Sequence, residues 1–126
     1  MKKRKKTQLD FEIEFYKKIV SERPRFLQAL SALGDALTKK GLYEEGLKID
    51  EKLSKINPEN SIVFYNLACS YSLVGKIKEA FKALKKAIIL GYDDFDYMEK
   101  DPDLENLRKS PYYSQLKEKI KRIKNL

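Results

Sequence analysis

Apolar residues recur at three- and four-residue steps in four stretches of the chain, as they do along one face of an α-helix. The clearest stripe consists of Phe64, Leu67, Ala68 and Tyr71. No stretch shows the sustained alternation of apolar and polar residues that marks a β-strand. The pattern therefore predicts an all-helical protein, with helices over residues 26–40, 43–56, 60–74 and 77–90.

These predicted helices repeat with a fixed period. Gly41 and Gly75 each follow a helical pattern, at the place where a residue with left-handed backbone commonly ends a helix, and they lie 34 residues apart. Pro24 and Pro58, which precede helical patterns, have the same separation. A period of this length is typical of stacked helix–turn–helix units. Within a predicted helix, Gly34 indicates that a neighbouring helix approaches closely, because glycine is otherwise costly there.

The flanks of the two repeats predict shorter helical pieces. Residues 10–22 resemble the second helix of an incomplete preceding unit. After Gly91 the pattern breaks, and Asp103 and Ser110 are predicted to begin two further helices that cap the stack. We expect the last helix to bury one stripe, formed by Tyr112, Leu116, Ile120 and Ile123. The predicted organisation is a basic disordered tail over residues 1–9 and a single domain over 10–126, comprising a half-repeat (10–23), two repeats (24–57 and 58–91) and capping helices (92–124).

The basic charge of the chain is concentrated at its ends. The net charge is +8 over 126 residues, yet residues 2–6 are all basic and residues 117–124 hold five basic residues and one acidic residue. The body between the ends is therefore close to neutral, which argues against a nucleic-acid-binding fold. Basic ends can hold phosphate backbones or anionic lipid weakly, but such blocks are usually solvated tails.

Few residue types that carry catalysis or bind metals are present. The chain has no histidine and one cysteine, Cys69, so the usual zinc sites and histidine-based catalysis are excluded. The acidic stretch over residues 93–105 lacks the ligand order of a calcium loop. We therefore predict that the protein is not an enzyme and needs neither cofactor nor metal. A single cysteine, no apolar stretch that could span a membrane and no secretory signal together predict a cytoplasmic protein.

The repeat resembles the tetratricopeptide family, whose pattern is W-x2-L-G-x2-Y, then A-x3-F, then P. The second unit matches these places in order with Phe64, Leu67, Ala68, Tyr71, Ala80 and Leu84, and the first with Leu30, Leu33, Gly34, Leu37, Gly46 and Pro58. Asp50 departs from the pattern, because it stands where the family has an aromatic residue. The segment from Gly91 to Pro111 resembles the tail of many bacterial members. The resemblance implies an αα-superhelix, a right-handed stack of antiparallel helix pairs with an atypical helical C-terminal cap.

The resemblance also implies a binding groove, because the first helix of each unit lines the concave face in this family. In the first unit the corresponding places hold Gln28, Ser31, Asp35, Thr38 and Lys39. In the second unit they hold Ile62, Tyr65, Cys69, Ser72 and Leu73. The predicted helix over 60–74 is then apolar on two sides and needs a partner on both. Either a ligand or the chain's own C-terminal segment covers the second side, and the residues favour neither alternative.

The function that this resemblance implies is a scaffold that binds a peptide or protein segment in its concave groove. The alternative is an accessory factor for nucleic acid or anionic membrane that acts through the basic tails. The N-terminal half-repeat also places Phe11, Phe15 and Ile19 at an edge that no preceding unit covers. Because uncovered apolar edges of repeat proteins tend to associate, we expect a homodimer through the N-terminal helix.

Overall fold

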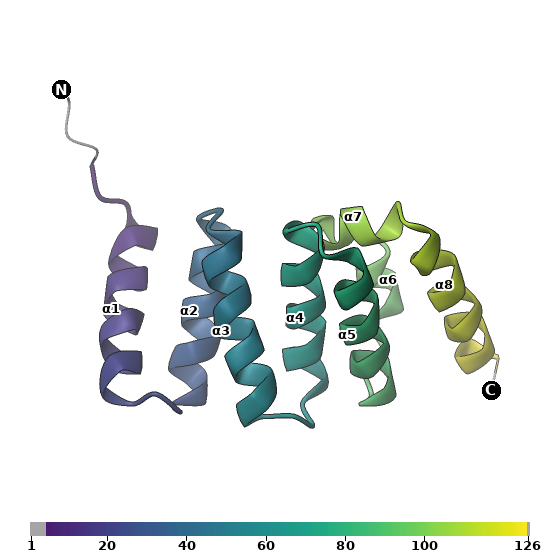
Figure 1. Ribbon diagram of the computed structural model, residues 1–126, viewed down its shortest axis with the longest axis horizontal. Coiled ribbons are helices and arrows are strands. Elements are labelled where there is room, and N and C mark those ends of the chain that lie inside the picture. Colours follow the sequence, from purple (N-terminus) through teal and green to yellow (C-terminus); the bar gives the residue numbers. More distant parts are fainter. Residues whose placement is uncertain (1–4, 126) are drawn as a thin grey trace. The chain divides into compact units, whose positions relative to one another are not determined.

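The computed structural model describes residues 5–125, and this part of the chain contains helices and no strand. The elements are α1 (Gln8–Glu22), α2 (Leu27–Lys39), α3 (Tyr43–Ile56), α4 (Ser61–Leu73), α5 (Ile77–Ile89), α6 (Phe95–Met98), the 3-10 helix η1 (Pro102–Leu104), α7 (Glu105–Arg108) and α8 (Pro111–Lys124) (Figure 1). They form two compact units, one ending at Ile56 and the other beginning at Asn57.

The four helices of the predicted repeats are confirmed, with ends that differ from the expected ones by a residue or so. Gly41 and Gly75 end α2 and α4 with backbone φ angles of +86° and +82°. These values lie in the left-handed region that favours glycine. The residue after each glycine donates its backbone N–H back into the helix, from Leu42 to the Leu37 carbonyl and from Lys76 to the Tyr71 carbonyl, both at 2.9 Å. The 34-residue period thus reflects two copies of one helix-ending turn.

In the first unit, α2 packs against both α1 and α3. Its core is an apolar cluster of Ile13, Leu33, Ala36 and Leu37, with Leu9, Tyr16, Val20 and Ile49 packed around it. The amphipathic pattern of α1 explains why this helix joins the unit, because it buries one apolar stripe against α2. The opposite side of α1 stays exposed.

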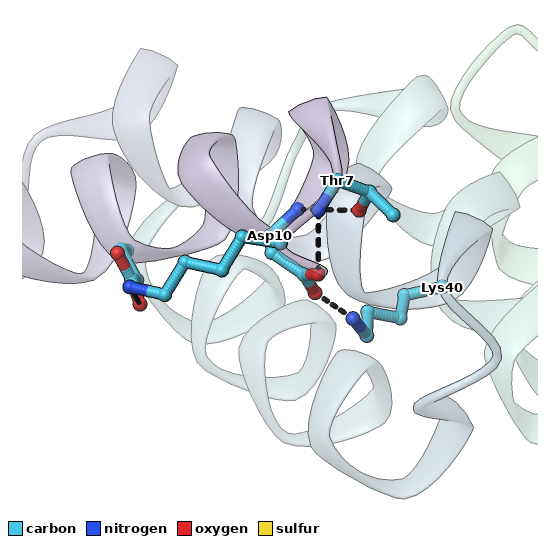
Figure 2. A network of polar contacts seen from close by, with 5 residues as sticks. Thr7, Asp10 and Lys40 are labelled. Atoms are coloured by element: carbon cyan, nitrogen blue, oxygen red, sulfur yellow. Dashed lines mark hydrogen bonds and ion pairs between the residues drawn. The ribbon is translucent and has the colours of Figure 1, made fainter. Parts of the chain in front are cut away.

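Thr7 fixes the start of α1 (Figure 2). Its hydroxyl oxygen accepts from the Asp10 backbone N–H at 3.2 Å, and its own backbone N–H donates to the Asp10 carboxylate at 3.0 Å, which is a capping box. The Asp10 carboxylate also pairs with Lys40 just after α2, and so ties the two helices together. The predicted tail over residues 1–9 is therefore too long, because Gln8 and Leu9 already belong to α1. Residues 1–4 lie outside the described residues.

The close approach predicted at Gly34 is confirmed. A Cβ atom at this position would lie 3.0 Å from Oδ1 of Asp50 and 3.3 Å from Cγ2 of Ile49, both on α3. Asp50 is buried at the place where the resemblance calls for an aromatic ring. A short side chain at position 50 therefore sits directly against the backbone of α2.

The second unit is built on the pair α4 and α5, whose contact buries Ala68, Leu84 and Ala87 completely. The chain then returns over this pair as α6, η1 and α7, and α8 packs on α5 (Figure 1). Asp94 caps α6 by accepting from the Tyr97 backbone N–H at 3.2 Å.

Two details of this C-terminal segment differ from the prediction. Asp101, not Asp103, caps the next helical turn, because its carboxylate accepts the Asp103 backbone N–H at 3.0 Å. In α8, which begins at Pro111 as expected, the buried stripe consists of Tyr113, Leu116 and Ile120, whereas Tyr112 is half-buried and Ile123 is exposed. The true and the predicted stripes share Leu116 and Ile120 and follow the same helical spacing, so the pattern alone did not distinguish them.

Candidate functional site

On α2, the predicted groove positions lie on a polar, accessible face. Gln28, Ser31, Asp35 and Lys39 are exposed, and Thr38 is half-buried. The Lys39 ammonium pairs with the Asp35 carboxylate one turn earlier at 2.9 Å. That hydrogen-bonded pairing raises the pKa of Lys39. The other sides of α2 pack against α1 and α3, so this is the exposed face of the helix.

On α4, the predicted groove positions have different surroundings. Ile62 is exposed and Leu73 is half-buried, but Tyr65, Cys69 and Ser72 are buried. The Tyr65 hydroxyl donates to Oδ2 of Asp101 at 2.6 Å, and the Cys69 thiol lies 3.6 Å from the same oxygen. A carboxylate from the C-terminal segment therefore covers this part of the helix.

Ser72 is held by the next turn of the same segment. Its hydroxyl accepts from the Leu107 backbone N–H at 3.1 Å, and its carbonyl accepts from the Asn106 side-chain amide at 2.9 Å. Of the two alternatives for the second apolar side of α4, the structure has the C-terminal segment. This corrects the expectation that Cys69 and Ser72 face a groove, because in the structure they contact Asp101 and Leu107 instead. Tyr65 is buried beside them by its bond to Asp101.

Asp101 organises the covering segment. Asp101 is 3% exposed, and its carboxylate accepts hydrogen bonds from the Tyr65 hydroxyl and the Asp103 backbone N–H. Its backbone carbonyl accepts a hydrogen bond from the Arg108 guanidinium at 2.6 Å. The same guanidinium donates to the Met98 carbonyl at 2.9 Å. Burial, followed by the hydrogen bond to Asp101, raises the pKa of the Tyr65 hydroxyl far above its ordinary value. Tyr65 is therefore a neutral hydrogen-bond donor at physiological pH.

The ligand atoms of Cys69, Asp101 and Asp103 lie within 4.8 Å of one another, close enough to be considered for a metal ion. Both carboxylate oxygens of Asp101 already accept hydrogen bonds, one from Tyr65 and the other from the Asp103 backbone. Hydrogen bonds within the protein thus account for the geometry of this cluster.

A hollow of about 400 Å³ opens beside the covered part of α4, and we call it the α4–α6 hollow. Tyr65 and Tyr92 stack in its wall, with ring centroids 4.2 Å apart and planes inclined by 10°. Tyr97 is 51% exposed, with its ring centroid 6.4 Å from that of Tyr65. The full lining is Ser61, Ile62, Tyr65, Asn66, Gly91, Tyr92, Asp93, Asp94 and Tyr97.

Only part of this hollow was predicted from the sequence. Ile62 and Tyr65 were expected as binding residues, whereas Tyr92, Tyr97 and the two aspartates were not. These four residues belong to the run of aromatic and acidic residues that follows Gly91. Nothing in the local pattern shows that this run folds back beside α4.

Comparison with solved structures identifies the architecture. The chain superposes on MamA 41-end from Desulfovibrio magneticus RS-1 with a TM-score of 0.67 and 18% identity, covering 94% of this chain and 69% of that one. The MamA RS-1 ArsTM double mutant gives a TM-score of 0.66 and 18% identity, and the superposition covers 92% of this chain and 67% of that one. The fold is a tetratricopeptide-like helical repeat. This confirms the predicted fold class, and the likeness, at such low identity, concerns the fold alone.

Comparison with curated sequences finds a relative in a plant. The chain is 42% identical over 86 residues to a chloroplastic protein of Arabidopsis thaliana. The match covers 66% of this chain and 26% of the relative, so the tetratricopeptide-like chain spans about a quarter of that protein's length. No protein-family model matches the chain. Within the described residues, no helix is both long and apolar enough to cross a membrane.

Proposed function

We propose that this chain is a protein-interaction module that binds a segment of a partner protein. The observation that carries the proposal is the α4–α6 hollow, which lies on the first helix of a repeat pair in a tetratricopeptide-like fold. Ile62 is 55% exposed at its edge. A concave surface with an apolar wall and a few polar groups is the usual form of a binding site.

The exposed face of α2 is a second surface that we assign to partner binding. Gln28, Ser31, Asp35 and Lys39 present donors and acceptors of both charges along the helix. Polar positions of this kind suit the solvated rim of an interface, where they contribute to specificity. Each unit then carries a binding surface of its own, polar on α2 and mainly aromatic and acidic beside α4.

Site-specific photo-crosslinking in cells that normally make the protein tests this function. We expect a photoreactive phenylalanine at Ile62, and another at Ser31, to give discrete covalent adducts with a partner protein. The matched control is the same group at Ile89 on α5, an isoleucine that is 81% exposed and lies outside the hollow. Equal adducts from position 89, or none from positions 62 and 31, would refute the proposed function.

The alternative function stays a prediction from the basic tails. In the structure, the exposed side of α8 carries Lys117, Lys119, Lys121, Arg122 and Lys124. This charge suits an anionic surface. A hollow of about 370 Å³ on α8 has Lys117, Lys121 and Lys124 in its lining, together with Glu99 and Glu118. The cytoplasmic location likewise stays a prediction, and the Arabidopsis relative is named a chloroplastic protein.

We also propose the homodimer through α1. Phe11 and Phe15 lie one helical turn apart and are 54% and 60% exposed, on the side of α1 away from Ile13 and α2. Burying such an aromatic pair against its symmetry mate removes apolar surface from water in both copies.

A further inference from the structure

The segment that borders the α4–α6 hollow is unusually acidic for this basic protein. Residues 93–105 include seven aspartates and glutamates and a single lysine, although the whole chain has a net charge of +8. Two of these residues, Asp93 and Asp94, line the hollow and are exposed. None of the nine lining residues is basic. The hollow therefore attracts positive charge, whereas an anion there would meet no compensating group.

Aromatic rings give the hollow a second means of holding a cation. The stacked rings of Tyr65 and Tyr92 are buried in its wall, and the exposed ring of Tyr97 stands at its rim, so a cation that enters meets the Tyr97 ring as well as carboxylates. Attraction between a cation and a ring face is strongest where water is partly excluded. Asp101 lies directly behind Tyr65 and bonds to its hydroxyl. The negative charge of Asp101 is also the main reason why the pKa of Tyr97 is raised, so its field reaches the rim.

Ile62 indicates which kind of cation fits. Its side chain adds an apolar patch next to the carboxylates and rings. Lysine and arginine have this combination of an apolar stem and a charged head, and their stems lie along apolar surface while the heads stay near water or carboxylate. A bare metal ion would gain nothing from the isoleucine, whereas an apolar stem would.

We propose that the α4–α6 hollow binds a lysine or arginine side chain from a basic segment of a partner protein. The stem packs on Ile62, and the head lies between the Tyr97 ring and the carboxylates of Asp93 and Asp94. This inference rests on the proposed function and names the chemistry of the partner.

The test is an NMR titration of the full chain with two synthetic peptides, acetyl-Ala-Leu-Lys-Leu-Ala-amide and the same peptide with glutamate in place of lysine. At low ionic strength the lysine peptide should shift the resonances of Ile62, Tyr92 and Tyr97, and the glutamate peptide should not. Raising the salt concentration to about 0.5 M should lower the affinity for the lysine peptide severalfold, because salt screens exposed charges.

Three variants locate the contact. Asp93→Asn and Tyr97→Leu should each lower the affinity for the lysine peptide by about threefold, which is the effect expected from losing one exposed ionic or cation–ring contact. Asp96→Asn is the matched control, since Asp96 is exposed on α6 but does not line the hollow. It removes the same charge and should weaken binding by less than about 1.5-fold.

Several outcomes would overturn the proposal. Equal losses in Asp93→Asn and Asp96→Asn would show diffuse attraction to an acidic surface instead of a site. Equal binding of the glutamate peptide would show that charge plays no part. If photo-crosslinking at Ile62 succeeds while these peptide results fail, the protein-binding function stands and only its cationic ligand is wrong.

Discussion

The hydrogen bond between Tyr65 and Asp101 offers a direct measurement of how firmly the C-terminal segment is held on α4. Tyr65→Phe keeps the ring that stacks on Tyr92 and removes only the hydroxyl, which donates to the carboxylate at 2.6 Å. Hydrogen bonds to charged groups contribute about 1.5–3 kcal/mol when they are buried. The cysteine thiol and the Asp103 backbone remain as partners of Asp101, so we expect the free energy of unfolding to fall by about 2 kcal/mol.

Urea denaturation followed by circular dichroism gives this free energy, and Tyr97→Phe is the matched control. The Tyr97 side chain is 51% exposed, so loss of its hydroxyl should change stability by less than about 0.5 kcal/mol. A double-mutant cycle with Asp101→Asn isolates the pair, and we expect a coupling energy of at least about 1 kcal/mol. A Tyr65→Phe protein as stable as the wild type, or a cycle with no coupling, would refute the view that this bond holds the segment in place.

The same variant has a signature at high pH. The pKa of Tyr65 is raised in the folded protein, so in the unfolded chain the hydroxyl loses its proton first, near pH 10. The unfolded state then binds fewer protons than the folded state, and stability falls as the pH rises above 10. Tyr65→Phe should reduce this alkaline loss relative to the wild type. An identical pH dependence in both proteins would contradict the burial of the hydroxyl.

Two further predictions concern the N-terminal helix. Thr7→Ala removes the capping box of α1 and should lower the free energy of unfolding by about 1 kcal/mol. Deletion of residues 2–5 should change that free energy by less than about 0.5 kcal/mol. Thermal or urea denaturation measures both effects, and equal effects would contradict the assigned cap. Phe15→Glu should convert the proposed dimer to a monomer in multi-angle light scattering, and a wild-type chain that is monomeric at high concentration would refute the dimer.

Local sequence determined the helices and the turns between them. The 34-residue recurrence of Gly41 and Gly75 predicted two equivalent turns, because a left-handed backbone position favours glycine wherever it occurs. Gly34 predicted that a neighbouring helix lies close. Glycine lowers the stability of a helix interior, and a close packing contact with that neighbour must offset this loss. These features depend on residues within a turn or two of one another, and the spacing of side chains along a helix is enough to recognise them.

The candidate site was decided by the tertiary structure. The sequence showed that α4 has a second apolar side, but the residue that covers it, Asp101, lies 36 positions beyond Tyr65. The exposed hollow arises from the same return of the chain, which places Tyr92, Tyr97 and the two aspartates beside Ile62. An aromatic and acidic turn has the same composition whether it is solvated or packed, so composition gave no sign of this arrangement. Contacts between distant segments depend on how whole helices pack, and only the folded chain shows which groups meet.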